Sequence, residues 1–145
     1  MRDLPRQLSV EQLAELFEGH TRFVDRLAGL EDPLGQADEI LASLDEELKV
    51  EALNAHPAIG AKGLSAHSAT EQGTDTDPAV LAELSYQNQV YQEKFGFRFV
   101  VFVAGRSKRE ILQVLSERIG GTREEELETG CKELVAIAKD RWTRT

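Results

Sequence analysis

Residues 91–103 read YQEKFGFRFVVFV, the end of a helical pattern followed by a run with a different pattern. The run from Phe97 to Val103 is rich in β-branched and aromatic residues, which is typical of a strand. No second run of this kind occurs, and a lone strand has no partner for its backbone hydrogen bonds. We therefore expect an extended crossing through the core. Gly96, directly before the run, is a typical helix terminator.

Amphipathic helix patterns lie on both sides of this run. A Ser or Thr followed three residues later by Gln or Glu predicts a helix start where an apolar stripe follows, as at Ser9 with Gln12, Ser107 with Glu110, and Thr122 with Glu125. Asp77-Pro78 predicts another start. Apolar stripes predict further helices over about 21–30 and 37–56, the second as one continuous helix that ends before Pro57. The expected fold is all-α: a single domain over residues 1–145, a bundle of about six to eight helices with one buried extended segment.

Composition excludes several classes of protein. The chain has 145 residues, with 17 basic against 26 acidic side chains and a net charge of −9, which argues against nucleic-acid binding. The longest apolar run, 99–104, is too short to cross a membrane, and the start of the chain lacks the apolar core of a secretory signal. The single cysteine, Cys131, excludes an intramolecular disulfide and a cysteine-rich zinc site. A cytoplasmic location is the simplest expectation.

A polar stretch at residues 63–77, GLSAHSATEQGTDTD, is long for a loop in a compact domain, and such loops are often functional. His56 precedes Pro57 at a predicted helix end, and a carboxylate facing it would form an acid–base pair. The polar candidates around the loop are His67, Ser68, Glu71, Gln72, Arg98 and Arg106.

Structural interpretations of the same residues remain open. A His-Pro pair is common in turns, and polar loop residues are usually solvated. Arg106 has Glu110 within reach as an ion-pair partner one helical turn on. Cys131 lies on an apolar stripe, where cysteine usually serves as a small hydrophobic side chain. His56 and His67 with Glu71 fit no recurrent spacing of zinc ligands.

Four motifs occur in order along the chain: His56-Pro57 with Ile59-Gly60, Ser68-Ala69-Thr70-Glu71-Gln72, residues 91–101 (YQEKFGFRFVV), and Gly105-Arg106-Ser107. In this order and spacing they resemble the motifs of the OHCU decarboxylase family, where OHCU is 2-oxo-4-hydroxy-4-carboxy-5-ureidoimidazoline. The resemblance extends from about residue 9 to Trp142. Its most specific part is Lys-Phe-Gly-Phe-x-Phe at 94–99.

The resemblance implies an all-α enzyme, often a homodimer, that needs no metal or organic cofactor. Its small-molecule substrate is OHCU, which loses its carboxylate to give (S)-allantoin in urate breakdown. Carried onto matching positions, the catalytic pair is His56 and Glu71, with His56 handling the proton and Glu71 orienting and charging it. The implied substrate-binding residues are Ser68 and Gln72 for the ureido and ring amide groups, and Pro57, Phe99, Val100 and Val101 as the pocket lining.

The chain departs from the family pattern at two positions that concern the substrate carboxylate. Many members have proline at the position of Arg98, and some have arginine at the position of Ala104. Arg106 is the nearest replacement for the latter, so Arg98 and Arg106 are both candidates for the cation that contacts the substrate. The loop between Gln72 and Asp77 also looks shorter than in many members.

Two alternatives belong to other functional classes. One is a hydrolase or lyase acting on a related ureide in the same pocket. The other is a non-catalytic interaction module in which Phe97 to Val103 forms a dimer surface and the polar loop is merely solvated. Replacing His56 or Glu71 would abolish turnover in an enzyme. In the interaction module the same replacements would change little except stability.

Overall fold

The computed structural model describes residues 3–57 and 77–144, and within these ranges every regular element is a helix. The helices are α1 (Val10–Phe17), α2 (Arg22–Leu27), α3 (Pro33–Ser43), α4 (Glu46–Asn54), α6 (Pro78–Phe95), α7 (Lys108–Ile119) and α8 (Arg123–Arg144). The predicted all-α class is confirmed. The polar stretch falls outside the described residues except for Asp77.

Local capping explains where most of these helices begin. The Ser9 hydroxyl accepts from the Gln12 N–H, and the Ser107 hydroxyl accepts from the Glu110 N–H, each within a complete capping box. Asp77 Oδ1 accepts from the Ala79 N–H at 3.0 Å, with Pro78 at the first helical position. These side chains satisfy N–H groups that have no partner inside the helix. The predicted starts are confirmed.

The predicted continuous helix over 37–56 is wrong, because the chain breaks into α3 and α4. Leu44 is extended, with φ −76° and ψ 156°, and Asp45 accepts from the Leu48 N–H at 3.3 Å. The Asp45 carboxylate thus starts a new helix inside an apolar stripe that reads as unbroken. Helix α3 also begins earlier than expected, at Pro33.

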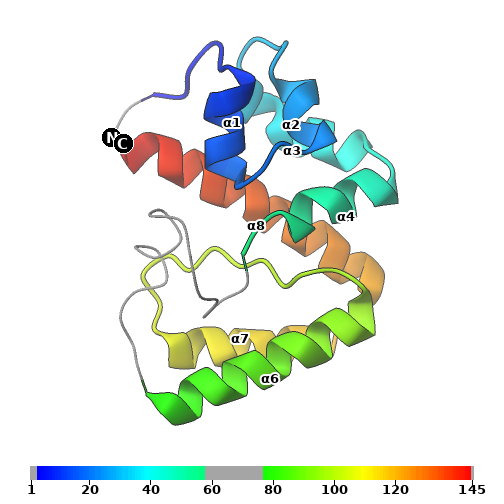
Figure 1. Ribbon diagram of the computed structural model, residues 1–145, viewed down its shortest axis with the longest axis vertical. Helices are drawn as coiled ribbons and strands as arrows, with labels where there is room; N and C mark the ends of the chain where they lie inside the picture. Colours follow the sequence, from blue (N-terminus) through cyan, green and yellow to red (C-terminus); the bar gives the residue numbers. More distant parts are fainter. Residues whose placement is uncertain (1–2, 58–76, 145) are drawn as a thin grey trace.

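The helices form two groups on either side of the long helix α8 (Figure 1). Helices α1 to α4 contact one another and α8, while α6 and α7 pair with each other. The extended segment that leads from α6 to α7 crosses between α8 and this pair (Figure 1). The two ends of the described chain meet, because Trp142 Nε1 donates to the Asp3 carbonyl at 2.7 Å.

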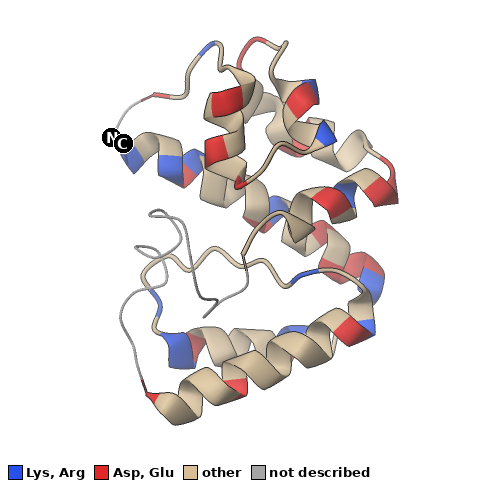
Figure 2. Ribbon diagram, viewed as in Figure 1, with Lys and Arg blue, Asp and Glu red and all other residues tan. Residues whose placement is uncertain are grey.

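The extended segment is part of the core, as predicted. Phe97, Phe99, Val100 and Val101 are each 3% exposed or less. The segment is uncharged except for basic positions near its two ends (Figure 2). A dimer surface made of Phe97 to Val103 is excluded, since one chain already buries most of these side chains.

Candidate functional site

His56 lies just beyond the C-terminal end of α4, where its backbone N–H donates to the Leu53 carbonyl at 3.1 Å. Its side chain is buried, with 7% of its surface exposed. Among the described residues, no group forms a hydrogen bond with the buried Nδ1 atom. Buried polar atoms without partners are uncommon in folded proteins, and they often mark a ligand-binding or catalytic position.

Arg98 fixes the His56 turn from the extended segment. Its Nη1 atom donates to the carbonyl of His56 at 2.7 Å and to that of Asn54 at 3.3 Å. In return, Asn54 Oδ1 accepts from the Arg98 backbone N–H at 2.9 Å. The guanidinium therefore serves as a brace for backbone carbonyls, which is a structural position for this candidate.

Arg141 is a fully buried cation that the sequence patterns did not single out. It has no exposed surface, donates from Nη1 to the Leu16 carbonyl at 2.9 Å, and pairs with Glu18 at 3.2 Å. Its signal in the sequence is its spacing, because Leu134, Ala138 and Arg141 follow one helical face. The next residue, Trp142, is only partly buried.

The surroundings of His56 favour its neutral form. Burial is the main cause and the positive charge of Arg141 is the second, with a smaller contribution from Arg98. Together they outweigh the opposing field of Glu18 and lower the pKa of His56 to about 4. At neutral pH the imidazole is therefore uncharged and able to accept a proton.

Arginine side chains, one distant and one nearby in the chain, take the place of a β-ladder along the extended segment. Arg118 Nη1 donates to the Val100 carbonyl at 2.9 Å, and Arg106 donates to the carbonyls of Phe102 and Val103. Among the described residues, no backbone hydrogen bond is formed by the N–H groups of Phe99, Val100 or Val101. The described part of the chain therefore leaves these three buried N–H donors unused.

The described residues bring together only part of the predicted site. His56 and Pro57 lie on one turn, and Arg98 binds that turn from the segment containing Phe99, Val100 and Val101. Arg106 contacts its own loop and, among the described residues, forms no close ion pair with Glu110, although its positive charge helps to lower the pKa of that carboxyl. Glu110 accepts from the Ser107 N–H at 3.0 Å. His67, Ser68, Glu71 and Gln72 lie outside the described residues, so their part in the site stays a prediction.

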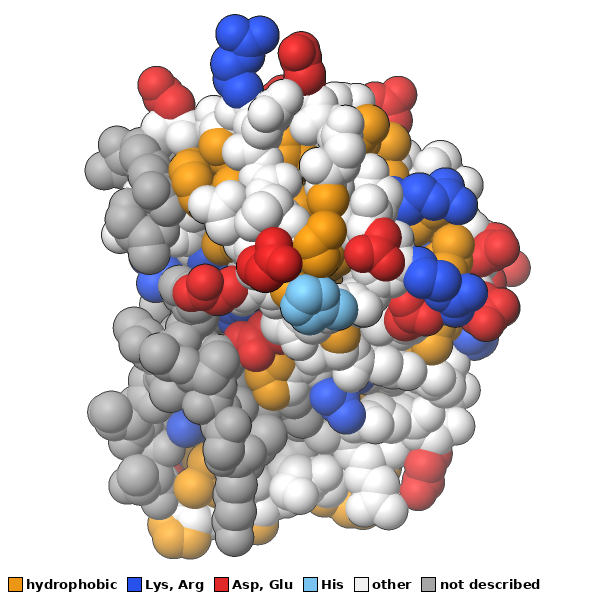
Figure 3. Space-filling model, turned by 45° about the horizontal axis from the view of Figure 1, so that its top comes forward, with side chains coloured by type: hydrophobic (Ala, Val, Ile, Leu, Met, Phe, Trp, Pro, Cys, Tyr) orange, Lys and Arg blue, Asp and Glu red, His pale blue; other side chains and the backbone are white. Residues whose placement is uncertain are grey.

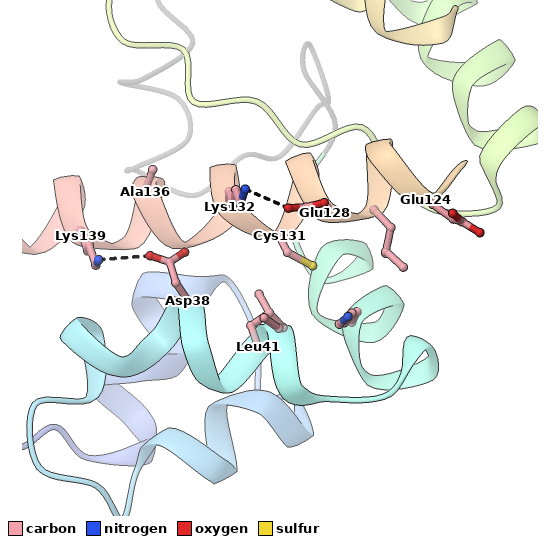
Figure 4. A pocket seen from close by; sticks show the side chains of 11 residues that line it. Asp38, Leu41, Glu124, Glu128, Cys131, Lys132, Ala136 and Lys139 are labelled. Atoms are coloured by element: carbon pink, nitrogen blue, oxygen red, sulfur yellow. Dashed lines mark hydrogen bonds and ion pairs between the residues drawn. The ribbon is translucent and has the colours of Figure 1, made fainter. Parts of the chain in front are cut away.

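A groove of about 810 Å³ lies elsewhere, between α3, α4 and α8. Cys131 points from α8 toward α3 and α4, and ion pairs join Lys139 to Asp38 and Lys132 to Glu128 on the rim (Figure 4). The lining contains none of the predicted site residues. Burial raises the pKa of the Cys131 thiol to about 11, as expected for an inert cysteine.

A metal site and a membrane-spanning helix each have a recognisable structural signature. No group of three or more His, Cys, Asp or Glu side chains within 3–57 and 77–144 is arranged to hold a metal ion. No helix in that part of the chain is long and apolar enough to span a membrane. On the face in Figure 3, acidic and basic side chains are intermixed.

Comparison with known proteins gives a family match over almost the whole chain. The family model described as OHCU decarboxylase matches residues 2–143. A protein of Halalkalicoccus jeotgali named 2-oxo-4-hydroxy-4-carboxy-5-ureidoimidazoline decarboxylase is 27% identical over 89% of this chain and 80% of its own. The uric acid degradation bifunctional protein PucL of Bacillus subtilis is 24% identical over 97% of this chain, which spans only 31% of that relative's length.

The fold has a solved counterpart. A crystal structure of OHCU decarboxylase in the presence of (S)-allantoin superposes with a TM-score of 0.77 and 27% identity. The match covers 92% of this chain and 96% of that one. The arrangement of helices described above is therefore shared with that protein.

Proposed function

Because this chain belongs to the OHCU decarboxylase family, we propose that it decarboxylates OHCU to (S)-allantoin in urate breakdown. The observation that carries the proposal is the buried, neutral His56, whose Nδ1 atom has no hydrogen-bond partner among the described residues. It lies next to buried positive charge and to an extended backbone whose N–H donors those residues leave unused. The solved relative that superposes on this chain was crystallised with (S)-allantoin, the product that this reaction would yield.

The reaction breaks the bond between the ring carbon and the carboxylate. Carbon dioxide leaves, and the electron pair stays on the ring carbon and enters the conjugated ring, which serves as the electron sink. One proton then bonds to the neighbouring ring carbon, which carries the ureido group, while the carbon that lost carbon dioxide gives up its hydroxyl proton and becomes a carbonyl. A ring nitrogen that received the electron pair also takes up a proton, so the substrate anion consumes one proton overall. Because the substrate holds its own sink, we propose that no metal or organic cofactor takes part, and that dialysis against a chelator leaves turnover unchanged.

His56 is the proposed proton carrier. In the ligand-free protein it is neutral at pH 7 and has to take up a proton before it can deliver one. A substrate anion and the Glu71 carboxylate would both raise its pKa on binding, since a nearby negative charge favours the imidazolium. Delivery from one fixed side chain to one face of the ring would set a single stereocentre.

Arg141 is our candidate for the cation that faces the substrate carboxylate. The guanidinium groups of Arg98, Arg106 and Arg141 all donate to backbone carbonyls. Among them, the positive charge of Arg141 has the largest effect in lowering the pKa of His56, ahead of Arg98. Its contacts with Leu16 and Glu18 hold it in place before substrate arrives. Such preorganised charge is a large source of electrostatic stabilisation.

The backbone of Phe99, Val100 and Val101 is the proposed wall of the pocket. A ureide and an imidazolone present alternating N–H and C=O groups, which match the donors and acceptors of an extended chain. Ser68 and Gln72 would complete these contacts, and Pro57 would line the wall beside His56.

The test follows optically active allantoin by circular dichroism with freshly generated OHCU, which decays unaided to the racemate. We expect one enantiomer in excess, with kcat/KM reduced by about 10²- to 10⁴-fold in His56→Asn and in Glu71→Gln. His20→Asn is the matched control, because His20 is exposed. No excess of one enantiomer from folded wild-type protein would refute the activity, and related ureides would then be tested.

We further propose that the chain forms a homodimer in the cytoplasm and acts there without nucleic acid or a membrane. The dimer is supported by the family resemblance, and the cytoplasmic location by the presence of a single cysteine. Light scattering coupled to size exclusion distinguishes a 16.1 kDa monomer from a dimer.

A further inference from the structure

Arg118, Glu126 and Tyr91 form a buried polar cluster behind the extended segment. Arg118 Nε donates to Glu126 Oε1 at 2.7 Å, and the Tyr91 hydroxyl donates to the same oxygen at 2.8 Å. The side chains of Arg118 and Glu126 are only 11% and 6% exposed. The cluster joins α6, α7 and α8 at one carboxylate.

The cluster also holds two consecutive residues of the segment. Arg118 Nη1 donates to the Val100 carbonyl at 2.9 Å, while the guanidinium carbon lies 4.6 Å from the centre of the Phe99 ring. On the same ring, Tyr91 packs edge-on at 5.3 Å between centroids. One side chain therefore fixes both the carbonyl direction of Val100 and the plane of Phe99.

Stability alone is a weak explanation for this arrangement. Taking two charges out of water is costly, and apolar side chains of similar volume often stabilise a core at least as well. An extended backbone without a ladder, however, has no paired strand to set its rotation about its own axis, and among the described residues Arg118 alone bonds the backbone of residues 99–101. A fork of donors fixed to Glu126 can set that rotation, because guanidinium geometry is planar and rigid.

We propose that Arg118 is a positioning residue for the decarboxylation. Through the Val100 carbonyl and the Phe99 ring, it sets the direction in which the backbone of residues 99–101 faces the substrate. The inference rests on the proposed function, since that function makes this backbone a wall of the pocket. Arg118 acts through the segment and contacts no reacting atom.

Arg123 provides a matched control. It makes the same three kinds of contact: Nε donates to the Phe95 carbonyl at 2.8 Å, the guanidinium carbon lies 5.3 Å from the Phe97 ring centre, and Nη1 pairs with Glu46. Its carbonyl partner, however, belongs to the end of α6 and not to residues 99–101. Arg123→Met should therefore alter stability without altering the stereochemistry of the product.

The experiment compares Arg118→Lys, Arg118→Met and Arg123→Met with the wild-type chain, each checked for folding by its thermal transition. For both Arg118 variants we expect kcat to fall by about 10- to 100-fold, as misplacement near 1 Å can cost. We also expect a lower enantiomeric excess of allantoin and an unchanged acid limb of the pH profile. Tyr91→Phe keeps both Arg118 contacts with the segment and should show a weaker form of the same effects.

A second readout does not depend on turnover. Amide hydrogen exchange at residues 99–102 should accelerate in the Arg118 variants and stay at the wild-type rate in Arg123→Met. If the wild-type chain is active and folded Arg118→Met matches it in kcat and enantiomeric excess, the positioning role is refuted while the activity stands. A folded wild-type chain that gives no enantiomeric excess refutes the activity, and with it a role in that reaction.

Discussion

The capped helices and the extended segment are held in place in opposite ways. The starts of α1 and α7 depend on contacts three residues apart, between Ser9 and Gln12 and between Ser107 and Glu110. The segment at 97–103 depends on Asn54, which is 44 residues from Arg98, and on Arg118, which is 18 residues from Val100. Local contacts thus set the scaffold, whereas distant side chains set the backbone nearest to His56.

The largest loss of stability should follow from Arg141→Met, because Arg141 is fully buried and donates to a carbonyl 125 residues away in the chain. The variant leaves the Leu16 carbonyl and the largely buried Glu18 without their cation. Breaking a buried ion pair on one side costs about 3–5 kcal/mol in the free energy of unfolding. Urea denaturation measures this, and Glu18→Gln added to Arg141→Met should recover part of it. A loss below about 1 kcal/mol would show that the distant contacts are energetically minor.

The next effect is a pH dependence of stability that arises from His56. Its pKa is about 4 in the folded protein against an ordinary 6.5, so between these values the unfolded chain binds the proton more strongly. Neutral His56 makes its full contribution to the free energy of unfolding above pH 6.5. This contribution, up to about 3 kcal/mol, is lost as the pH falls toward 4. Denaturation curves at several pH values should show this loss in wild type and in His20→Asn, but not in His56→Asn. Equal pH dependence in His56→Asn would contradict the buried neutral state.

A smaller effect is expected from Arg98→Met, which removes the brace from the His56 turn. Two charge-assisted hydrogen bonds to carbonyls are lost at a partly exposed site, so we expect about 1–2 kcal/mol in unfolding free energy. Faster amide exchange at residues 54–57 should accompany it. Asn54→Ala is the companion variant, since it removes the acceptor for the Arg98 N–H from the same junction. Unchanged amide exchange at residues 54–57 in both variants would show that the turn is stable without the contacts between Arg98 and Asn54.

The smallest effect should come from Ser107→Ala, which removes a purely local contact. Loss of the hydroxyl cap of α7 should cost about 1 kcal/mol and leave kcat/KM unchanged. Thermal unfolding and the circular dichroism assay measure the two quantities. A fall in kcat/KM without a fall in stability would break the division between scaffold and site.

The same division explains what the sequence could predict. Capping residues and apolar stripes depend on residues that are close together in the sequence. The helix starts and the buried extended crossing were therefore predictable. The helix start at Asp45 was missed because the apolar stripe continues through it. The stripe predicts one helix, whereas the Asp45 cap begins a second one. Arg141, Glu18 and the Arg118 cluster were missed because their partners lie far away in the chain. His56 was found by a motif, but its neutral state follows from burial, which only packing determines.

The rate at which the lone Cys131 is chemically modified can report local opening of this protein. Cys131 is 7% exposed in the lining of the groove between α3, α4 and α8, and a pKa of about 11 leaves little thiolate at pH 8. A disulfide reagent added to native protein would therefore react slowly, and its rate would rise when α8 moves away from its neighbours. The reaction rate would report how often this half of the molecule opens, at one position and without any engineered label.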